Sequence, residues 1–377
     1  MELLSRDQSV ITGRQNVEPL HTLHNFPVFF GCVEHAPEQD VRADMCWGIC
    51  PETGVVQLTR LIPLPVLYQA QHMDGTGATW QDFYEDFAEY ISVQAPKSIL
   101  EIGGGSGALA EAFIRRAPGV VWTMVEPNPT HPASDRIRTI RAFFDASFHT
   151  DAQYDAVVFS HTLEHAYDPN EFLRAIAAYL PMGGKLIFAY PQLDVWLSKM
   201  YLSALNFEHT MLLTDYFVDY LLRVHGFRIL EKHIYRDHSV YYTVERVPCE
   251  EQPIPLPPSR YGAYRELFMN FVRYHTQLVE QFNARVHAHG GEVYLFGGHI
   301  FSQYLLEFGL REEAIQGILD NSKAKQGKRL YGSRLMVMDP EHLRGRGAVA
   351  VILRVGPYRE EILRQLRRIN SDVVILE

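Results

Sequence analysis

The segment Ser98-Ile-Leu-Glu-Ile-Gly-Gly-Gly-Ser-Gly107 decides how the rest of this chain is interpreted. Its apolar residues Ile99, Leu100 and Ile102 predict a strand that is buried on both faces. The glycines that follow free the backbone and remove side chains, so that a ligand can approach the main chain. Residues 108–116 then have a helical composition. A buried strand, a glycine-rich turn and a helix form the first half of a nucleotide-binding α/β unit.

The acid at the end of this strand helps to decide which of two classes of ligand the turn can bind. A dinucleotide site typically has Gly-x-Gly-x-x-Gly, with the pyrophosphate at the helix N-terminus. Here the pattern is Glu-x-Gly-x-Gly-x-Gly, made by Glu101, Gly103, Gly105 and Gly107. A carboxylate repels a pyrophosphate but suits a cationic or hydroxyl-rich ligand. S-adenosylmethionine, with its ammonium, sulfonium and ribose, fits this pattern; a glycine turn without a ligand is the alternative.

The bulk composition is that of a globular protein. The chain has 377 residues, of which 47% are hydrophobic and 21% charged, and this length predicts two or three domains. The net charge of −10 argues against general binding to nucleic acid or to anionic membranes. The N-terminus lacks the apolar core of a signal peptide, and we find no apolar run as long as a membrane helix. We therefore expect a cytoplasmic protein.

Strand and helix patterns alternate after the glycine turn. Strands are expected at 120–125, 154–159 and 184–189, and helices at 80–93, 171–180 and 215–224. Such alternation predicts a doubly wound, mostly parallel sheet with ligands at the carboxyl ends of its strands. Residues 227–247 contain two further strand-like runs that suit an antiparallel sheet edge.

The remaining parts of the chain are expected to form separate regions. We expect residues 1–78 to form a small irregular N-terminal region, with short strands at 27–31 and 54–62. Residues 79–248 are expected to form the Rossmann-like central domain. Proline is frequent in 249–260, which predicts a linker. A second Rossmann-like α/β pattern follows in 261–377. It begins with a long amphipathic helix at 261–289, and further strands are expected at 292–296, 314–319, 334–338, 348–354 and 372–376, with helices at 300–308 and 359–369.

Three features together resemble the class I S-adenosylmethionine-dependent methyltransferases. They are the glycine turn, the acid Glu126 that ends the next strand, and Phe159-Ser-His-Thr-Leu-Glu-His165 followed by Asp168-Pro169. In such a site Glu126 accepts hydrogen bonds from the ribose hydroxyls, and Asp145 contacts the adenine amine. The resemblance implies these cofactor-binding residues: Glu101, Gly103, Gly104, Gly105, Gly107, Glu126, Pro127, Asp145, His161 and Thr162.

A narrower resemblance, to the sugar C-methyltransferases of deoxysugar biosynthesis, extends over most of the chain. Four stretches carry it: Cys50-Pro-Glu-Thr-Gly-Val-Val-Gln-Leu58, Leu205-Asn-Phe-Glu-His209, Tyr294-Leu-Phe-Gly-Gly298 and Ile318-Leu-Asp-Asn-Ser-Lys-Ala-Lys-Gln-Gly327. Members of that family have an N-terminal zinc-binding region, a central methyltransferase domain and a C-terminal Rossmann-like domain. The resemblance implies methyl transfer to a nucleotide-activated keto sugar.

The zinc ligands of that family are largely replaced in this chain. Thr53 stands at one cysteine position, and Ser5-Arg6-Asp7-Gln8 resembles a Cys-Arg-x-Cys segment without its cysteines. Of these four ligand positions only Cys50 is a cysteine, and one thiolate cannot hold a structural zinc ion. We expect a degenerate region that folds by packing and binds no metal. A site rebuilt from Cys32, Cys46 and Cys50 is the alternative.

The resemblance assigns the acceptor chemistry to a short segment. His209 matches the base that removes a proton beside the keto group, which suits the reference pKa of histidine. Glu208 is expected to orient the imidazole or to bind a sugar hydroxyl, and His165 matches a second active-site histidine. Asn206 stands where the family has a tyrosine, and an amide cannot act as an acid near neutral pH. The sequence therefore leaves both the identity of the acceptor molecule and the atom that is methylated undecided. The alternatives are O- or N-methylation of another small metabolite, and a non-catalytic paralogue that binds the cofactor or a nucleotide sugar.

The resemblance also suggests residues that bind the substrate, a nucleotide-linked sugar. The resemblance implies that the C-terminal domain holds the nucleotide part of this substrate, and Lys325, Lys328 and Arg329 are candidates for contacts with its phosphates. The segment Gly297-Gly298-His299 lacks the Gly-x-Gly-x-x-Gly pattern, so it does not favour a dinucleotide site. We expect a monomer or a homodimer without a nucleic-acid or membrane partner. The expected substrate-binding residues are Tyr68, His72, Tyr190, Gly298, His299, Lys325 and Tyr358.

Overall fold

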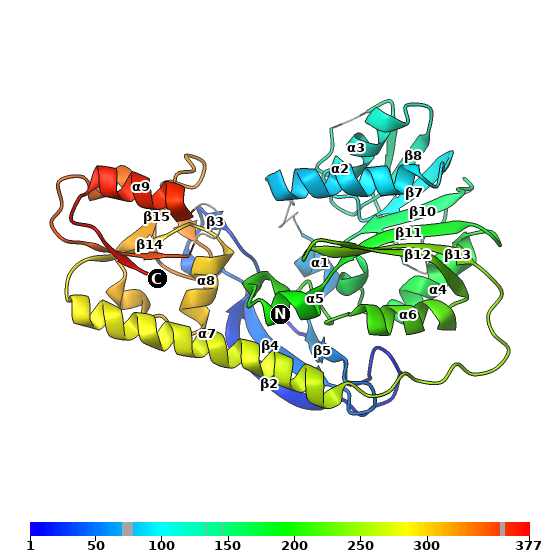
Figure 1. Cartoon of the computed structure of the whole chain (residues 1–377), viewed down its shortest axis with the longest axis horizontal. Coiled ribbons are helices and arrows are strands. Elements are labelled where there is room, and N and C mark those ends of the chain that lie inside the picture. Colours follow the sequence, from blue (N-terminus) through cyan, green and yellow to red (C-terminus); the bar gives the residue numbers. More distant parts are fainter. Residues whose placement is uncertain (70–77, 133, 146, 355–358) are drawn as a thin grey trace. The chain divides into compact units, whose positions relative to one another are not determined.

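A computed structural model describes residues 1–69, 78–132, 134–145, 147–354 and 359–377. The chain forms two compact units (Figure 1). The first contains residues 1–21, 46–196 and 206–265, and the second contains 22–45, 197–205 and 266–377. The expected N-terminal region of residues 1–78 is thus divided between the units, because residues 22–45 group with the second one.

A seven-stranded sheet forms the centre of the first unit. Its strand order is β12-β13-β11-β10-β7-β8-β9. Strands β11, β10, β7, β8 and β9 run parallel to one another, and β13 pairs antiparallel with both β11 and β12. The strands are β7 Ser98–Ile102, β8 Val121–Val125, β9 Ile137–Ile140, β10 Ala156–Ser160, β11 Lys185–Pro191, β12 Phe227–Tyr235 and β13 Ser239–Arg246. The predicted doubly wound sheet and its antiparallel edge are confirmed.

Helices cover both faces of this sheet, with α2 and α3 on one face and α4 and α6 on the other (Figure 1). Apolar side chains of α2 and α3 pack on Ile99, Trp122 and Val158, while those of α4 and α6 pack on Leu100 and Phe159. Alternate residues of one strand thus enter opposite cores, as expected for a sheet covered on both sides. The helices are α2 Ala78–Ser92, α3 Ala108–Arg116, α4 Pro169–Tyr179, α5 Leu193–Ser198 and α6 Asp215–Val224.

The remaining segments of the first unit are short. Strand β1 (Leu4–Ser5) pairs with β6 (Arg60–Leu61), and α1 spans Leu64–Leu67. Strand β5 (Val56–Leu58) pairs with β4 in the order β2-β4-β5.

Two strands of the N-terminal segment were not expected from the sequence. Strands β2 (Glu18–Pro27) and β4 (Arg42–Ile49) each have residues in both units. The strand predicted at 27–31 is wrong: β2 ends at Pro27, and Val28 and Phe29 are buried in a bend instead. The run at 54–62 is divided into β5 and β6.

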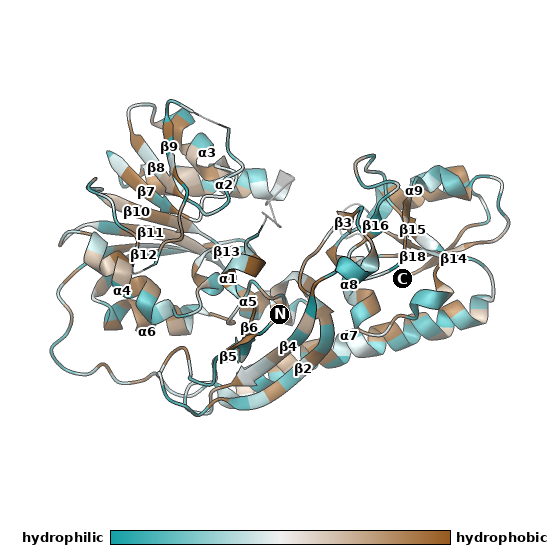
Figure 2. Ribbon diagram, turned by 180° about the vertical axis from the view of Figure 1, so that it is seen from behind, coloured by the Kyte–Doolittle hydropathy of each residue, from teal (hydrophilic) through white to brown (hydrophobic). Residues whose placement is uncertain are grey.

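The second unit contains a five-stranded parallel sheet with the order β17-β15-β14-β18-β19. Helix α7 packs on one face through Val279, Phe282 and Val286, and α9 packs on the other face. Hydrophilic and hydrophobic residues alternate along α7 (Figure 2), as expected for a helix with one buried face. The elements are α7 Tyr261–His289, β14 Val293–Phe296, α8 Ile300–Glu307, β15 Gly317–Leu319, β17 Val337–Met338, β18 Ala350–Leu353, α9 Arg359–Ile369 and β19 Val374–Leu376, with the short pair β3 Cys32–Val33 and β16 Arg329–Leu330.

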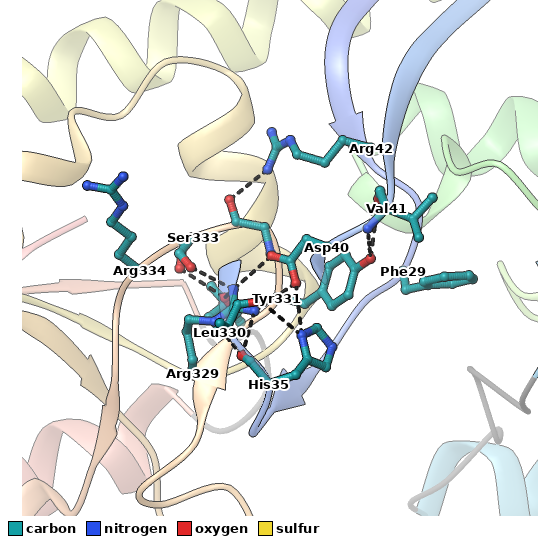
Figure 3. A network of polar contacts seen from close by, with 12 residues as sticks. Phe29, His35, Asp40, Val41, Arg42, Arg329, Leu330, Tyr331, Ser333 and Arg334 are labelled. Atoms are coloured by element: carbon teal, nitrogen blue, oxygen red, sulfur yellow. Dashed lines mark hydrogen bonds and ion pairs between the residues drawn. The ribbon is translucent and has the colours of Figure 1, made fainter. Parts of the chain in front are cut away.

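A buried ion pair fixes residues 32–42 within the second unit (Figure 3). The Arg329 guanidinium donates to both Asp40 carboxylate oxygens at 2.7 and 2.8 Å, and to the carbonyl oxygen of Ser333 at 2.7 Å. The side chains of Arg329 and Asp40 are only 6% and 3% exposed. The suggested phosphate contact of Arg329 is therefore wrong, because Asp40 and backbone carbonyls already occupy its donors.

None of the helices in the part of the chain that the structure describes combines the length and apolarity needed to cross a membrane.

We predict that Asp40→Ala lowers the free energy of unfolding of the full chain by about 3–5 kcal/mol, because it leaves the buried Arg329 charge without its partner. Urea denaturation followed by circular dichroism measures this change. The matched control is Glu341→Ala, since the Glu341–Arg344 pair is exposed and is expected to contribute less than about 1 kcal/mol. Equal effects of the two variants would contradict a stabilising role for the buried pair.

Candidate functional site

The glycine turn between β7 and α3 leaves no room for side chains. The backbone N–H of Gly103 donates to the carbonyl of Val125, the last residue of β8, at 2.9 Å. Gly103 has φ of 75°, and a Cβ there would lie 2.9 Å from Thr162 Oγ1. A Cβ at Gly104 would lie 2.3 Å from the sulfur of Met124. The backbone of the turn is therefore packed against β8 and against residues that follow β10.

Glu101 lies beneath this turn and is 2% exposed. Its carboxylate accepts a 2.8 Å hydrogen bond from the indole Nε1 of Trp122. Burial raises the pKa of Glu101 to about 7; the Trp122 bond opposes this shift and the nearby Glu126 charge adds to it. A cation next to this carboxyl would favour its ionised form.

Glu126 follows β8 and turns its carboxylate toward the glycine turn. One carboxylate oxygen accepts from the backbone N–H of Gly105 at 3.1 Å, and the other from that of Asn128 at 2.9 Å. Asn128 in turn donates its side-chain amide to the carbonyl of Tyr68. The predicted acid at the end of the second strand thus lies beside the predicted glycine turn, with Pro127 next to it in the chain.

The other predicted cofactor residues lie in different surroundings. Thr162 Oγ1 donates to the carbonyls of Ile102 and Ser160 at 3.3 Å, which places it against the turn. His161, with φ of 52°, contacts Ser239 Oγ at 2.8 Å and packs against Trp80. Gly107 has φ of 75° where α3 begins. Asp145 is exposed, and its carboxylate accepts from the N–H and hydroxyl of Ser147.

A second group of polar side chains follows β10. Glu164 and His165 lie in a 3₁₀ turn (Leu163–His165), and the His165 ring lies 5.3 Å, centroid to centroid, from that of His209. Glu164 is fully buried; neither of its carboxylate oxygens has a hydrogen-bond partner among the described residues, and burial raises its pKa to about 8. Burial also lowers the pKa of His165 to about 3, with a smaller contribution from His209, so His165 is neutral near pH 7.

The predicted acceptor residues surround this pair of histidines. Asn206 is 1% exposed, and its Oδ1 accepts a 2.7 Å hydrogen bond from the backbone N–H of His209. The amide that replaces the family's tyrosine therefore holds the loop of the proposed base. Glu208 keeps part of its surface exposed, but burial still raises its pKa to about 7. Tyr68 places its hydroxyl 3.5 Å from His165 Nδ1.

Backbone hydrogen bonds hold the His209 loop at the end of β10. The N–H of Thr210 donates to the carbonyl of Glu164 at 3.0 Å, and the N–H of Leu58 donates to the carbonyl of Thr210 at 2.8 Å. Arg6 is 9% exposed; its guanidinium donates to Leu58, Thr210 and Tyr167 carbonyls. The N-terminal segment thus positions the candidate catalytic loop.

Three predicted substrate residues meet in the second unit. The Gly298 N–H donates to Asp320 at 2.8 Å, and Lys325 Nζ lies 3.1 Å from the same carboxylate oxygen. His299 caps α8 by accepting the N–H of Phe301, and burial lowers its pKa to about 4. Asp320 was not among the predicted site residues, although it lies in the quoted 318–327 segment.

Tyr190, another predicted substrate residue, lies in the core of the first unit. Tyr190 is 0% exposed and packs in the core with Phe188 and Tyr242, which favours a structural role. His72 and Tyr358 lie outside the described residues.

Among the described residues, the cysteines of the N-terminal segment form no disulfide. Cys50 is buried and its Sγ contacts Asn16 Oδ1 at 3.7 Å, while Cys32 contacts the Gly298 carbonyl in the second unit. Within the described residues, the group of three potential metal ligands that lie close together is Glu164, His165 and His209.

Family models match two long stretches of the chain. Residues 70–232 match a methyltransferase domain, and residues 226–374 match a C-methyltransferase C-terminal domain. The C-methyltransferase NovU of Streptomyces niveus is 26% identical over 297 residues, which cover 73% of this chain and 70% of NovU. The protein is an S-adenosylmethionine-dependent class I methyltransferase.

Other similar proteins match shorter parts of the methyltransferase. An uncharacterized methyltransferase of Mycobacterium sp. (strain JLS) is 28% identical over 174 residues, which cover 44% of this chain and 64% of that protein. The crystal structure of the plantazolicin methyltransferase BpumL in complex with a monoazolic desmethylPZN analogue and SAH aligns with a TM-score of 0.37 and 14% identity, over 45% of this chain and 84% of BpumL.

We predict that Glu101→Gln removes a pH dependence of stability in the cofactor-free methyltransferase. The folded state holds the Glu101 proton up to about pH 7, whereas an unfolded glutamate releases it near pH ~4.3. The folded state therefore binds more protons in this window, and its stability falls as the pH rises through it. Glutamine still accepts from Trp122 but does not titrate.

Urea denaturation between pH 5 and pH 9 measures this difference. The stability of Glu101→Gln relative to wild type is expected to rise by about 3 kcal/mol across the range. The exposed Glu89→Gln variant is the control and should follow the wild-type profile. Parallel profiles for Glu101→Gln and wild type would contradict the raised pKa of this carboxyl.

Proposed function

We propose that this methyltransferase transfers a methyl group to a carbon atom of a nucleotide-linked keto sugar, with His209 as the base. One observation carries the proposal. The buried His209 lies beside His165 and Glu164 on a loop that is hydrogen-bonded to the residues after β10. Those residues follow the same sheet edge as the glycine turn, so a base and a methyl-donor site are close in the chain's own fold.

The glycine turn fits the cofactor on three observations. Side chains are excluded at Gly103 and Gly104, which leaves backbone available for contact. The buried carboxylate of Glu126 is held by two backbone N–H groups and retains lone pairs for ribose hydroxyls. Glu101 supplies a buried carboxyl beneath the turn, suited to a nearby positive charge. When bound, S-adenosylmethionine supplies an electrophilic methyl group.

His209 has the chemistry needed to prepare the acceptor. Its imidazole removes the proton from the carbon beside the keto group, and the electron pair of that C–H bond moves toward the keto oxygen. The resulting enolate carbon is the nucleophile. Asn206 keeps the His209 backbone in place through the Oδ1 bond, so it acts as a positioning residue. His165 is neutral and offers a hydrogen bond to the sugar, while Glu208 offers a carboxyl to a hydroxyl group.

The names of similar proteins support carbon as the acceptor atom. NovU is named a C-methyltransferase, and the model matched by residues 226–374 is a C-methyltransferase C-terminal domain. We assign the nucleotide part of the substrate to the second unit, where Gly298, His299 and Lys325 surround Asp320.

We expect Gly105→Asp to abolish S-adenosylmethionine binding in isothermal titration calorimetry. The new carboxylate would stand beside Glu126 and fill space on the backbone of the turn, where Gly105 has φ of 51°. The control is Gly119→Asp, since nothing lies within 4 Å of a Cβ at that exposed glycine. It should bind with unchanged affinity. Wild-type affinity in folded Gly105→Asp would refute the assignment of the turn.

We expect His209→Ala to slow deuterium exchange at the carbon beside the keto group by about 100-fold or more, as for loss of a general base. The measurement follows a nucleotide-linked 4-keto sugar by NMR in heavy water without cofactor. The exposed His149→Ala variant is the control and should exchange at the wild-type rate. Absence of exchange in the wild type would contradict carbanion chemistry and would favour O- or N-transfer. Undiminished exchange in His209→Ala would exclude His209 as the base.

A further inference from the structure

The carboxyl group of Glu164 is fully buried, and none of the described residues donates a hydrogen bond to it. Both of its oxygens are shielded from solvent, and neither has a donor among the described residues. Unpartnered buried groups of this kind are uncommon in native proteins, and a bound ion is one way in which such a group is satisfied. Two imidazoles, those of His165 and His209, lie close to Glu164, and one nitrogen of each joins a Glu164 oxygen in one cluster.

We propose that Glu164, His165 and His209 bind a divalent transition-metal ion, with zinc as the best match to the ligands. One ligand atom from each residue lies within 4.8 Å of the other two. Histidine nitrogen and carboxylate oxygen bind zinc at about 2.0–2.2 Å, so neighbouring ligand atoms in a tetrahedral site are about 3.4 Å apart. His165 Nε2 lies 3.8 Å from Glu164 Oε1, which is near this value.

The surrounding contacts hold these ligands in a suitable arrangement. Metal-binding histidines commonly use their second ring nitrogen for a hydrogen bond that sets the ring orientation. The Nδ1 atom of His165 faces the Tyr68 hydroxyl at 3.5 Å, which leaves Nε2 toward Glu164. The Thr210 N–H to Glu164 carbonyl bond fixes the backbone of His209 relative to the other two ligands.

The ligand set selects among metals and leaves room for a further ligand. Two imidazoles and a carboxylate suit zinc, cobalt or nickel, whereas magnesium and calcium prefer oxygen alone. Three protein ligands leave one position of a tetrahedral ion for water or for an acceptor oxygen, as in catalytic rather than structural zinc sites. The ligands of this site differ from the cysteines that hold zinc in the N-terminal region of the family that the sequence resembles.

If His209 is the base, as proposed above, a metal ion at this site is expected to block proton abstraction. An imidazole nitrogen that binds a metal ion cannot accept a proton at the same atom. Zinc at this site therefore removes the proposed base, and the ion acts as an inhibitor of proton abstraction. Chelation restores the base without any change in the chain.

Equilibrium dialysis of the metal-stripped full-length protein against zinc tests the site directly. We expect one zinc ion per chain, and Glu164→Gln should weaken binding by more than about tenfold. The matched control is Glu111→Gln, because Glu111 forms a different glutamate–histidine pair with His131 at 3.1 Å. It should bind zinc as the wild type does. Unchanged affinity in Glu164→Gln, or an equal loss in Glu111→Gln, would overturn the site.

Cobalt substitution gives a second readout that does not depend on a single variant. Cobalt bound by nitrogen and oxygen gives visible bands without the intense near-ultraviolet absorption of a cobalt–thiolate bond. His165→Gln should weaken these bands. A thiolate band in the wild-type spectrum would place the ion at a cysteine such as Cys46 or Cys50 and would overturn the proposal.

Deuterium exchange with added zinc separates this site from the proposed base. Loss of exchange on adding zinc, with recovery on adding a chelator, supports both. If one zinc ion binds in a Glu164-dependent way while exchange continues, the metal site stands and the assignment of His209 as base falls. If exchange depends on His209 but zinc does not bind, the base stands and the metal site falls.

Discussion

The parallel alignment of β10 between β7 and β11 is the constraint on which the first unit depends. Ala156 pairs with Ile99 on one side and with Lys185 on the other, and the register continues to the ends of the strands. Parallel strands place their carboxyl ends at one edge. The glycine turn, the carboxylate of Glu126 and the turn with Glu164 and His165 therefore reach the same edge, where the Gly105–Glu126 hydrogen bond joins the first two.

The His209 loop needs a second set of interactions, because no strand of the sheet carries it. Backbone bonds to Glu164 and Leu58 fix it, and the buried Arg6 guanidinium binds carbonyls on both sides. Arg6 belongs to the segment that resembles a zinc-binding motif without its cysteines. Burial lowers the pKa of Arg6 only to about 10, so the guanidinium stays charged and holds this segment through its hydrogen bonds.

The sequence predicted the elements whose patterns are local. Helices α3, α6, α7 and α9 have the expected bounds, and the strands of the two large sheets lie where apolar runs predicted them, except β9 (Ile137–Ile140), which was not predicted. Strands β2 and β4 were missed because histidine, proline and charged residues interrupt their alternation. The strand expected at 27–31 was wrong because its apolar residues are buried by tertiary packing in a bend.

In the candidate site, too, the residues set by local sequence patterns were predicted, and those set by contacts between distant segments were missed. Glu126 and the glycine turn were predicted together because their spacing is typical of the fold, and the Gly105–Glu126 bond places them side by side. Glu164 was not predicted as a site residue, since only the fold reveals that this glutamate is buried without a donor from the described part of the chain. Arg329 was suggested for phosphate, and no local pattern could reveal its pairing with Asp40, almost 300 residues earlier.

The acceptor atom is the central claim, and the fate of a labelled methyl group tests it most directly. The full-length protein is incubated with S-adenosylmethionine carrying a ¹³C-methyl group and with a nucleotide-linked 4-keto sugar, and the product is analysed by ¹³C NMR. We predict a one-bond coupling between the labelled methyl carbon and a sugar ring carbon at natural abundance, with a chemical shift typical of a C-methyl group. A methyl signal at the shift of a methoxy or N-methyl group would contradict carbon as the acceptor.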